Sequence, residues 1–485
     1  MLNLWILNTK PRSGEGLLRS GNDSTTDLLI LIYRITEPSA QFNPKSTSAF
    51  RGGLELVSPP ALVWYNVVKN GSVKLRRVNS GRWRAGSMVK PTTKTRIGIL
   101  TGGGDCAGLN PAMKWVVKTA LDERLRWERG IQYEVLGIRD GWKGLIRVEP
   151  MAADIPGYVV PLTEEMVRTW DRYGGTFLGT SRTNPYNPQN DQSKTVLDNI
   201  EKLGLKALIA IGGEDTLGVA YKLSQEGVNI IGIPKTIDKD LPGTDYTLGF
   251  ETALNVITEE VDRLRTTAGS HKRIFVVETM GRNAGWLALE GGESCGAFII
   301  LIPEYDFSIE RVCELVQGGR RAGARYEILV VAEGAKPSGC SEFVARDEVD
   351  GFGHKALGGI AEFLATEIQK ATKIDSRSVV LSHLQRGGAP CAYDRRMGRY
   401  FGIAAVDLVV KEDYGKMLSY RNGKVTAVPL KEATGPMNLV DVDRLYDVDR
   451  YNGRRSILNN TRQRGKQTGG VCAAGESAEL RQGKV

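Results

Sequence analysis

The chain has 485 residues, with 65 Lys and Arg against 56 Asp and Glu, and a formal net charge of +9. Its hydrophobic (41%) and charged (25%) shares are those of ordinary globular proteins, which excludes a mainly disordered or fibrous chain. The length predicts about two to four domains. The positive charge lies at the two ends: residues 1–88 sum to +7 and residues 461–485 to +3, which leaves −1 for residues 89–460. A nucleic-acid partner is therefore not expected, because it would need basic residues on the folded part.

Residues 1–93 are predicted to be an N-terminal extension that is disordered or not translated. Ser, Asn, Pro and Gly interrupt every apolar run there, and Met88 is the expected start of translation. The segment Ala61–Val68 is a candidate strand without a clear partner. The tail at 461–485 is rich in Gly, Gln and Arg and is also expected to be disordered.

The cysteines and the N-terminal apolar runs indicate a cytoplasmic protein. The six cysteines are dispersed without a CxxC pair, which argues against a disulfide framework or a zinc site and favours a reducing compartment. The longest apolar run near the N-terminus, Leu28–Tyr33, is far shorter than the roughly 20 residues of a membrane span. Neither a membrane partner nor a secretory signal is expected.

From residue 96 to about 460, apolar strands alternate with Gly-rich turns and helices. The first helix is predicted at Leu109–Leu121, and the strands are predicted at Arg96–Leu100, Leu205–Ile211, Val228–Ile233, Arg273–Glu278, Ala297–Ile302 and Glu327–Val331. This alternation is typical of a parallel α/β sheet that is covered on both faces. Ligands of such sheets bind at the carboxyl ends of the strands, where the Gly-rich turns lie.

Two strand-to-helix turns indicate phosphate and metal binding. Gly102–Asp105 (GGGD) has glycines that let backbone N–H groups approach a phosphate. In Gly212–Thr216 (GGEDT) two carboxylates would repel bare phosphate, but they suit Mg²⁺ placed between carboxylate and phosphate. Taken singly, the first could be an unliganded tight turn and the second an ordinary helix N-cap.

The segment Pro234–Asp240 (PKTIDKD) follows the third strand and combines a cation, a hydroxyl and two carboxylates. Asp238 could act as a general base, Asp240 could assist it, and Lys235 could neutralise charge on a transferring phosphoryl group. Alone, the segment could be a solvated charged loop. Arginines at strand ends, whose forks bind phosphate bidentately, are Arg273, Arg282, Arg377 and Arg386.

Taken together and in this order, the motifs resemble one family. From about Arg96 to about Asn459 the chain resembles the 6-phosphofructokinases of the phosphofructokinase A family, in TGGGD, GGEDT, PKTID, ETMGRNAGWLA, AEGA and SHLQRGG followed by AYDRRMG. The resemblance implies transfer of a phosphoryl group to the 1-hydroxyl of fructose 6-phosphate, giving fructose 1,6-bisphosphate. It also implies an α/β fold of two Rossmann-like parallel-sheet lobes with the active site in the cleft between them.

The resemblance further implies boundaries and partners. A phosphoryl-donor lobe is expected at 94–250 plus about 385–440, and a sugar-phosphate lobe at 251–384 plus about 441–460. The chain is expected to form a homodimer or homotetramer in which Arg273 and Arg377 act in the neighbouring subunit's site.

The resemblance assigns a role to individual side chains. Asp238 would accept the proton of the sugar hydroxyl, Glu214 would bind Mg²⁺, and Gly103 and Arg182 would lie against the donor phosphates. The expected substrate-binding residues are Thr236, Ile237, Asp238, Arg273, Met280, Gly281, Arg282, Glu333, Arg377, His383 and Arg386.

Two positions discriminate between phosphoryl donors. ATP-dependent members usually read GGDGS and PGTID, whose small residues leave room for the α-phosphate of a nucleotide. Here Asp215 places a carboxylate where that phosphate would lie, and Lys235 adds a positive charge beside the transferring group. This pair resembles the pyrophosphate-dependent branch, for which a readily reversible reaction is expected. An ATP-dependent 6-phosphofructokinase is the alternative.

The sequence leaves one departure and two rival classes to consider. Lys239 stands where the family usually has Asn, and its charge could tighten phosphate binding or point to solvent. A lipid or NAD kinase would lack the PKTID, MGR and HLQRGG motifs. A non-catalytic phosphosugar-binding protein is a remote alternative, since such a protein would be expected to have lost Asp238 or the arginines.

Overall fold

The chain divides into two units, Met1–Met88 and Val89–Val485. The computed structural model describes residues 64–69, 72–77, 94–124, 130–148, 157–340, 344–349, 352 and 355–456. In the first unit, β1 (Trp64–Lys69) pairs with β2 (Ser72–Arg77) in an antiparallel hairpin. The strand expected from Ala61 is therefore present and has a partner. The other predictions for the two ends of the chain lie outside the described residues.

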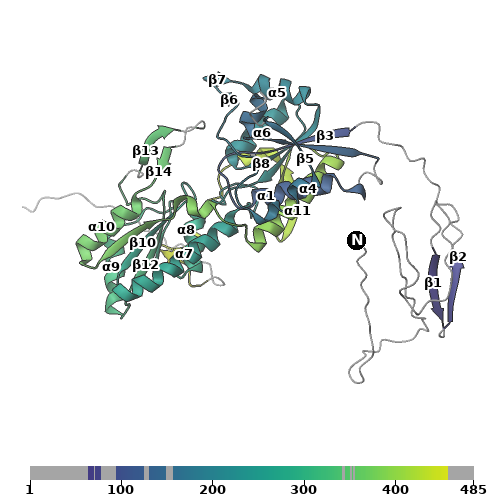
Figure 1. Ribbon diagram of the computed structural model, residues 1–485. Coiled ribbons are helices and arrows are strands. Elements are labelled where there is room, and N and C mark those ends of the chain that lie inside the picture. Colours follow the sequence, from purple (N-terminus) through teal and green to yellow (C-terminus); the bar gives the residue numbers. More distant parts are fainter. Residues whose placement is uncertain are drawn as a thin grey trace, which may run out of the picture. The chain divides into compact units, whose positions relative to one another are not determined.

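The larger sheet of the second unit has seven strands in the order β17-β16-β9-β8-β3-β4-β5 (Figure 1). Its five inner strands are parallel neighbours, and an antiparallel strand closes each edge. The strands are β3 (Lys94–Thr101), β4 (Gln132–Ile138), β5 (Val159–Leu162), β8 (Leu205–Gly212), β9 (Ile230–Pro234), β16 (Lys416–Arg421) and β17 (Lys424–Pro429). The predicted α/β fold with a covered parallel sheet is confirmed.

Helices cover both faces of this sheet. Figure 1 shows α5 (Ser193–Lys202) and α6 (Glu214–Gln225) above it, with α1 (Leu109–Ala120) and α11 (Ala392–Val410) below. The last two helices approach closely because α11 has glycines on the facing side. A Cβ at Gly402 would lie 2.7 Å from the carbonyl oxygen of Ala112. A side chain there would force the helices apart.

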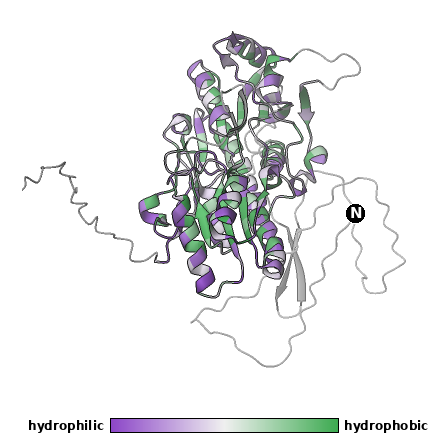
Figure 2. Cartoon of the chain, turned by 90° about the vertical axis from the view of Figure 1, so that its left-hand side faces the viewer, coloured by the Kyte–Doolittle hydropathy of each residue, from purple (hydrophilic) through white to green (hydrophobic). Residues whose placement is uncertain are grey.

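The smaller sheet has four parallel strands in the order β11-β12-β10-β15. Its strands β10, β11 and β12 are buried and mostly apolar, whereas the edge strand β15 is largely accessible. Figure 2 shows the apolar strands in green beneath helices whose hydrophilic residues are purple. The strands are β10 (Ile274–Thr279), β11 (Ile299–Leu301), β12 (Glu327–Ala332) and β15 (Ser376–Val380), and the helices are α7 (Phe250–His271), α8 (Trp286–Ser294), α9 (Ile309–Arg321) and α10 (Ile360–Thr372).

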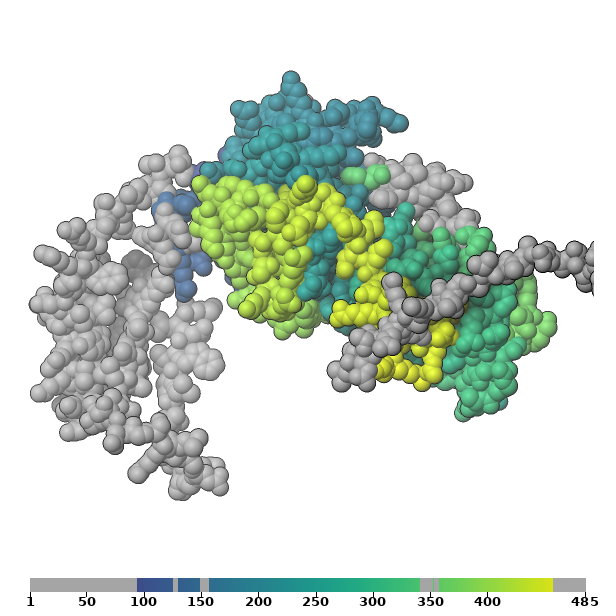
Figure 3. All heavy atoms as spheres, turned by 180° about the vertical axis from the view of Figure 1, so that it is seen from behind, coloured from purple at the N-terminus to yellow at the C-terminus, as the bar shows by residue number. Residues whose placement is uncertain are grey.

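The chain passes between the two sheets more than once. It leaves the larger sheet after β9, enters the smaller one through α7, and returns after β15 through α11. The C-terminal segment then runs back: the Tyr446 hydroxyl donates to the Ile300 carbonyl at 2.5 Å, beside β11. Figure 3 shows this segment in yellow on the rear face, between the yellow-green residues of the larger sheet and the green residues of the smaller one.

The remaining elements are short. They are α3 (Trp142–Ile146), α4 (Glu164–Val167), η1 (Trp170–Arg172), β6 (Tyr186–Asn187), β7 (Asn190–Asp191), β13 (Val344–Val349), β14 (Lys355–Leu357), η2 (Ser382–Arg386), η3 (Leu430–Thr434), α12 (Val442–Leu445), β18 (Tyr446–Asp447) and β19 (Asn452–Gly453). In the described part of the chain, no helix combines the length and apolar character that crossing a bilayer requires.

Candidate active site

The Gly-rich turn after β3 lies beside the N-terminus of α6, at the carboxyl ends of neighbouring strands. Gly103 adopts a φ of +75°, its N–H donates to the Ser181 carbonyl at 3.2 Å, and its carbonyl accepts from the Thr180 hydroxyl at 2.6 Å. A Cβ at Gly103 would lie 3.6 Å from both Lys235 Nζ and Thr216 Oγ1. The Lys235 ammonium group and the first turn of α6 therefore lie directly beside this glycine, and both kinds of group favour an anion.

Lys235 reaches this turn from the end of β9. Its side chain is buried, and its ammonium group donates to the Gly104 carbonyl. Burial lowers the pKa of Lys235, and the guanidinium of Arg386 lowers it further, while Asp105 and Asp238 act in the opposite direction. A phosphate bound here would favour the charged ammonium, because an anion at short range stabilises a cation in a buried site.

Carboxylates converge at the loop that follows Lys235. The Asp238 N–H donates to the Thr236 hydroxyl at 3.1 Å, whereas Asp238 Oδ1 is buried and accepts no hydrogen bond from the described residues. Burial raises the pKa of Asp240 to about 7, and the negative charges of Asp238 and Glu214 add to this shift. Glu214, the first residue of α6, is exposed at the same place.

These carboxylates fit a divalent cation. A positive ion would relieve the repulsion that raises the pKa of Asp240, and carboxylate oxygens are the ligands that Mg²⁺ prefers. Among the described residues no three His, Cys, Asp or Glu side chains are grouped as a metal site on their own. One or two carboxylates completed by substrate phosphate is the usual arrangement for Mg²⁺.

The residues expected to bind the sugar follow the strands of the smaller sheet. Burial and the negative charge of the nearby Asp238 raise the pKa of Glu333 to about 7, although the guanidinium of Arg282 opposes this shift. Glu333 therefore lies close to Asp238 although the two residues belong to different sheets. A cavity of about 420 Å³ opens at these strand ends, lined by Glu278, Thr279, Met280, Glu333, Leu357, Gly358, Gly359, Val380 and Ser382.

Arg386 connects this side to the Gly-rich turn after β3. From η2 its guanidinium donates to the Asp105 carbonyl at 3.1 Å, and Arg386 also lies near Glu333 and Lys235. His383 is exposed on the same short helix, with its Nδ1 3.0 Å from the Ser382 hydroxyl. The structure thus brings Lys235, Asp238, Glu333, Arg282 and Arg386 into one cluster.

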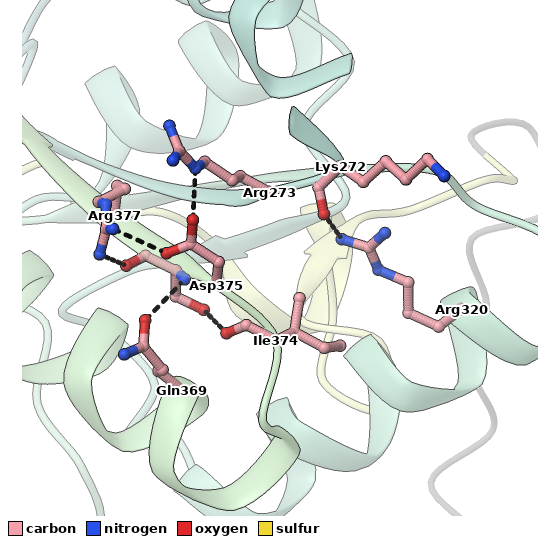
Figure 4. A network of polar contacts seen from close by, with 8 residues as sticks. Lys272, Arg273, Arg320, Gln369, Ile374, Asp375 and Arg377 are labelled. Atoms are coloured by element: carbon pink, nitrogen blue, oxygen red, sulfur yellow. Dashed lines mark hydrogen bonds and ion pairs between the residues drawn. The ribbon is translucent and has the colours of Figure 1, made fainter. Parts of the chain in front are cut away.

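Arg273 and Arg377 lie at the other end of the smaller sheet. Both side chains form ion pairs with Asp375, at 3.0 Å in the case of Arg377 (Figure 4). Arg273 precedes β10 and Met280 follows it, so the extended strand separates them by about 20 Å. These two arginines are therefore remote from the carboxylate cluster of their own chain.

The remaining predicted site residues differ in the exposure of their side chains and in their backbone conformation. Asp215 is half-buried in the first turn of α6, and Arg182 is exposed immediately after Ser181. Gly281 adopts a φ of +123° in the turn after β10. The Ile237 side chain is fully buried in the hydrophobic core, so Ile237 presents only its main chain to the loop surface.

Sequence reasoning missed Asp394, which binds the start of the helix α7 that follows the Lys235–Asp240 loop. This carboxylate is fully buried and accepts from the backbone N–H groups of Gly249 (2.7 Å) and Thr252 (2.8 Å), as well as from the Tyr246 hydroxyl. It thus satisfies the N-terminus of α7. The signal was an acidic residue in the first turn of a helix, inside the AYDRRMG motif.

Comparison with known proteins agrees with this architecture. Residues 96–409 match the phosphofructokinase family model, and the chain belongs to that family. It is 46% identical over 359 residues to the pyrophosphate–fructose 6-phosphate 1-phosphotransferase of Amycolatopsis methanolica, covering 74% of this chain and all of the relative. It is also 44% identical over 355 residues to the ATP-dependent 6-phosphofructokinase of Chloroflexus aurantiacus, covering 72% of this chain and 93% of the relative.

A solved structure supports the fold. The pyrophosphate-dependent phosphofructokinase from Marinobacter aquaeolei superimposes with a TM-score of 0.63 at 22% identity, over 74% of this chain and 89% of that one. The family resemblance drawn from the motifs and the two-lobed α/β fold are both confirmed.

Proposed function

We propose that this chain transfers a phosphoryl group from pyrophosphate to the 1-hydroxyl of fructose 6-phosphate, giving fructose 1,6-bisphosphate and phosphate in a reversible reaction. The observation that carries the proposal is the buried Lys235 ammonium, which lies beside Gly103 and in the same cluster as Asp238. Similarity to relatives that carry the pyrophosphate-dependent name supports the same donor.

Asp238 takes the proton of the sugar hydroxyl in this mechanism. Its Oδ1 accepts no hydrogen bond from the described residues, so no other protein group competes for the proton that this carboxylate would accept. Lys235 brings positive charge to the side where charge on the transferring group must be stabilised. Met280, Gly281, Arg282 and Glu333, with Thr236 and His383, form the wall that orients the sugar.

Glu214 would hold Mg²⁺ together with the donor phosphates. Asp240 lies close enough to Glu214 for its carboxylate to be attracted by the same ion. When bound, the ion neutralises negative charge on the phosphates. Gly103 lets the backbone approach the donor, and the exposed Arg182 adds a guanidinium beside that turn.

The donor is decided by two side chains. Asp215 occupies the start of α6 and would repel a third phosphate, and Lys235 compensates for the charge of a compact donor. Because relatives named for either donor are similar to this chain, ATP is the second candidate.

We also propose that the active form is a homodimer or homotetramer in the cytoplasm. Arg273 and Arg377, at the opposite end of the smaller sheet from their own cluster, would bind the 6-phosphate in the neighbouring subunit's site. Arg386 would complete the phosphate contacts from within the chain.

Coupled assays with pyrophosphate and with ATP, at matched Mg²⁺, test the proposal. We expect turnover of fructose 6-phosphate with pyrophosphate and release of phosphate in the forward direction. Activity with ATP alone would overturn the choice of donor. Absence of activity with both donors, in a folded protein that still binds fructose 6-phosphate, would favour a non-catalytic binding protein.

A further inference from the structure

Lys239 immediately follows the proposed base, and its charge is already engaged. Its ammonium group lies 2.6 Å from Glu290 Oε1 on α8, and faces the rings of Phe250 at 4.8 Å and Trp286 at 4.7 Å. The Lys239 side chain is only 20% exposed. An ammonium enclosed by a carboxylate and two aromatic faces is neither free in solvent nor available to a phosphate.

The main chain at the same point is held from the other side. Asn438, in the C-terminal segment, donates its side-chain amide to the Lys239 carbonyl and its backbone N–H to the Asp240 carbonyl, each at 2.8 Å. The Trp286 indole N–H donates to the Asn438 carbonyl at 2.7 Å. Trp286 therefore contacts both the ammonium group of Lys239 and the residue that holds its main chain.

The backbone of Lys239 needs such support. Its φ is +56°, in the left-handed region that a lysine adopts rarely and that Asn, the usual family residue, tolerates better. Asp238 is the next residue toward the N-terminus, and its Oδ1 has no hydrogen-bond partner in the described structure. The direction of that carboxylate therefore depends on the backbone on either side of it.

We propose that Lys239 is a positioning residue: the ammonium group in the recess of Phe250, Trp286 and Glu290 holds the loop in its left-handed turn, so that Asp238 remains aimed at the sugar hydroxyl. This inference rests on the proposed role of Asp238 as the base. The positive charge of Lys239 would thus fix the conformation of the loop, and it would not contribute to phosphate binding.

The test compares Lys239→Met with Lys239→Arg in the full-length chain. Methionine keeps the apolar stem but removes the charge, whereas arginine can still pair with Glu290 and stack on the rings. For Lys239→Met we expect kcat with pyrophosphate to fall about 10-fold or more, because small misplacements of a reacting group are costly. We expect KM for pyrophosphate and for fructose 6-phosphate to stay within about twofold, and Lys239→Arg to recover most of kcat.

Two further variants keep the test informative if Lys239→Met folds poorly. Glu290→Gln leaves the lysine in place and should lower kcat less than Lys239→Met does. The double variant should have a kcat close to that of Lys239→Met alone, because both substitutions remove the same contact. Lys424→Met makes the same chemical change on exposed β17 and should leave both constants unchanged. Thermal unfolding of each variant separates loss of fold from loss of turnover.

Two outcomes would overturn the inference. A raised KM for pyrophosphate at unchanged kcat would make Lys239 a phosphate ligand, and an unchanged kcat with a lowered unfolding temperature would make it merely structural. Asp238→Ala, assayed in parallel, separates this from failure of the proposed function. If Asp238→Ala is inactive and Lys239→Met is normal, only the positioning role fails; if Asp238→Ala remains active, the base and the inference fail together.

Discussion

The two ends of the smaller sheet carry side chains of the same kinds but in different settings. At the carboxyl ends, Glu333 lies with Asp238 and Arg282, where burial and like charge raise the pKa of Glu333 to about 7. At the amino ends, Arg273 and Arg377 are paired with Asp375. The first end holds carboxylates whose charges are incompletely balanced, whereas the second holds arginines that are already neutralised.

Under the proposed function, the first end carries the chemistry and the second end binds the 6-phosphate of a neighbouring subunit's substrate. Carboxylates with raised pKa values are typical of sites that gain a ligand or exchange a proton. Arginines arranged around one carboxylate are preorganised and can exchange that partner for a phosphate. In a single chain, one end of the smaller sheet contributes to the carboxylate cluster and the arginines lie at the opposite end. This arrangement is expected if the arginines of each copy complete the site of another copy.

The largest effect is expected from Asp238→Ala at the first end. Removing a general base typically lowers turnover by about 10²–10⁴-fold, and KM should change little because the proton transfer occurs only in the transition state. Steady-state kinetics with pyrophosphate measures this. An Asp238→Ala enzyme with near-normal kcat would contradict the assignment of the base.

The second effect tests whether the far end belongs to another copy. Arg377→Ala should raise KM for fructose 6-phosphate by about 10–100-fold, which corresponds to losing a charge-assisted hydrogen bond. Co-expression of Asp238→Ala with Arg377→Ala should then restore activity at a fructose 6-phosphate concentration far below the KM of Arg377→Ala, where each variant alone is nearly inactive. Random pairing of subunits gives about a quarter of the sites an intact base and an intact arginine. If the mixture stays inactive, Arg377 does not act in a neighbouring site.

Much of the first end could be predicted from sequence. Gly-rich turns after apolar strands mark the carboxyl edge of a parallel sheet, so Gly103, Lys235 and Asp238 were expected to lie together. The residues Met280 and Glu333 follow strands of the second sheet by the same rule. The resemblance to a known family added which role each residue has.

The rest depended on contacts between segments far apart in the chain. Asp394 meets the N-terminus of α7 across more than 140 residues, and Asn438 meets Lys239 across 199. No local pattern encodes such pairs. The sequence therefore left the direction of Lys239 open, and the pairing of Arg273 with Asp375 was not anticipated.

A third effect concerns the donor and sharpens the description of the first end. Replacing Asp215 and Lys235 together by glycine should lower kcat/KM for pyrophosphate about 10-fold or more, since a buried cation near the transferring group is lost. The ratio of kcat/KM for ATP to that for pyrophosphate should rise. Competition between the two donors in one assay measures that ratio directly. An unchanged ratio would remove these positions as determinants of donor choice.

The smallest effect compares two glutamates on one strand, β12. Glu327 begins the strand at the far end and pairs with Arg320 at 2.9 Å, whereas Glu333 follows it at the cluster. Because the pKa of Glu333 is raised from 4.5 to about 7 in the folded state, its ionisation lowers stability progressively as pH rises between these values. Glu333→Gln should therefore increase the free energy of unfolding by about 1–3 kcal/mol at pH 8, and by little at pH 4.5.

Glu327→Gln should increase the free energy of unfolding less than Glu333→Gln at pH 8. Burial raises the pKa of Glu327 too, but Arg320 opposes that shift and loses its ionic partner in the variant. Glu201→Gln, exposed on α5, is the matched control and should change stability little. Denaturant unfolding at the two pH values measures all three variants. If Glu333→Gln and Glu327→Gln both destabilise the protein at pH 8, the carboxylates at the cluster end are as well compensated as those at the far end. The site would then owe its reactivity to the placement of Asp238 and Lys235 alone, without a shortage of positive charge around its acids.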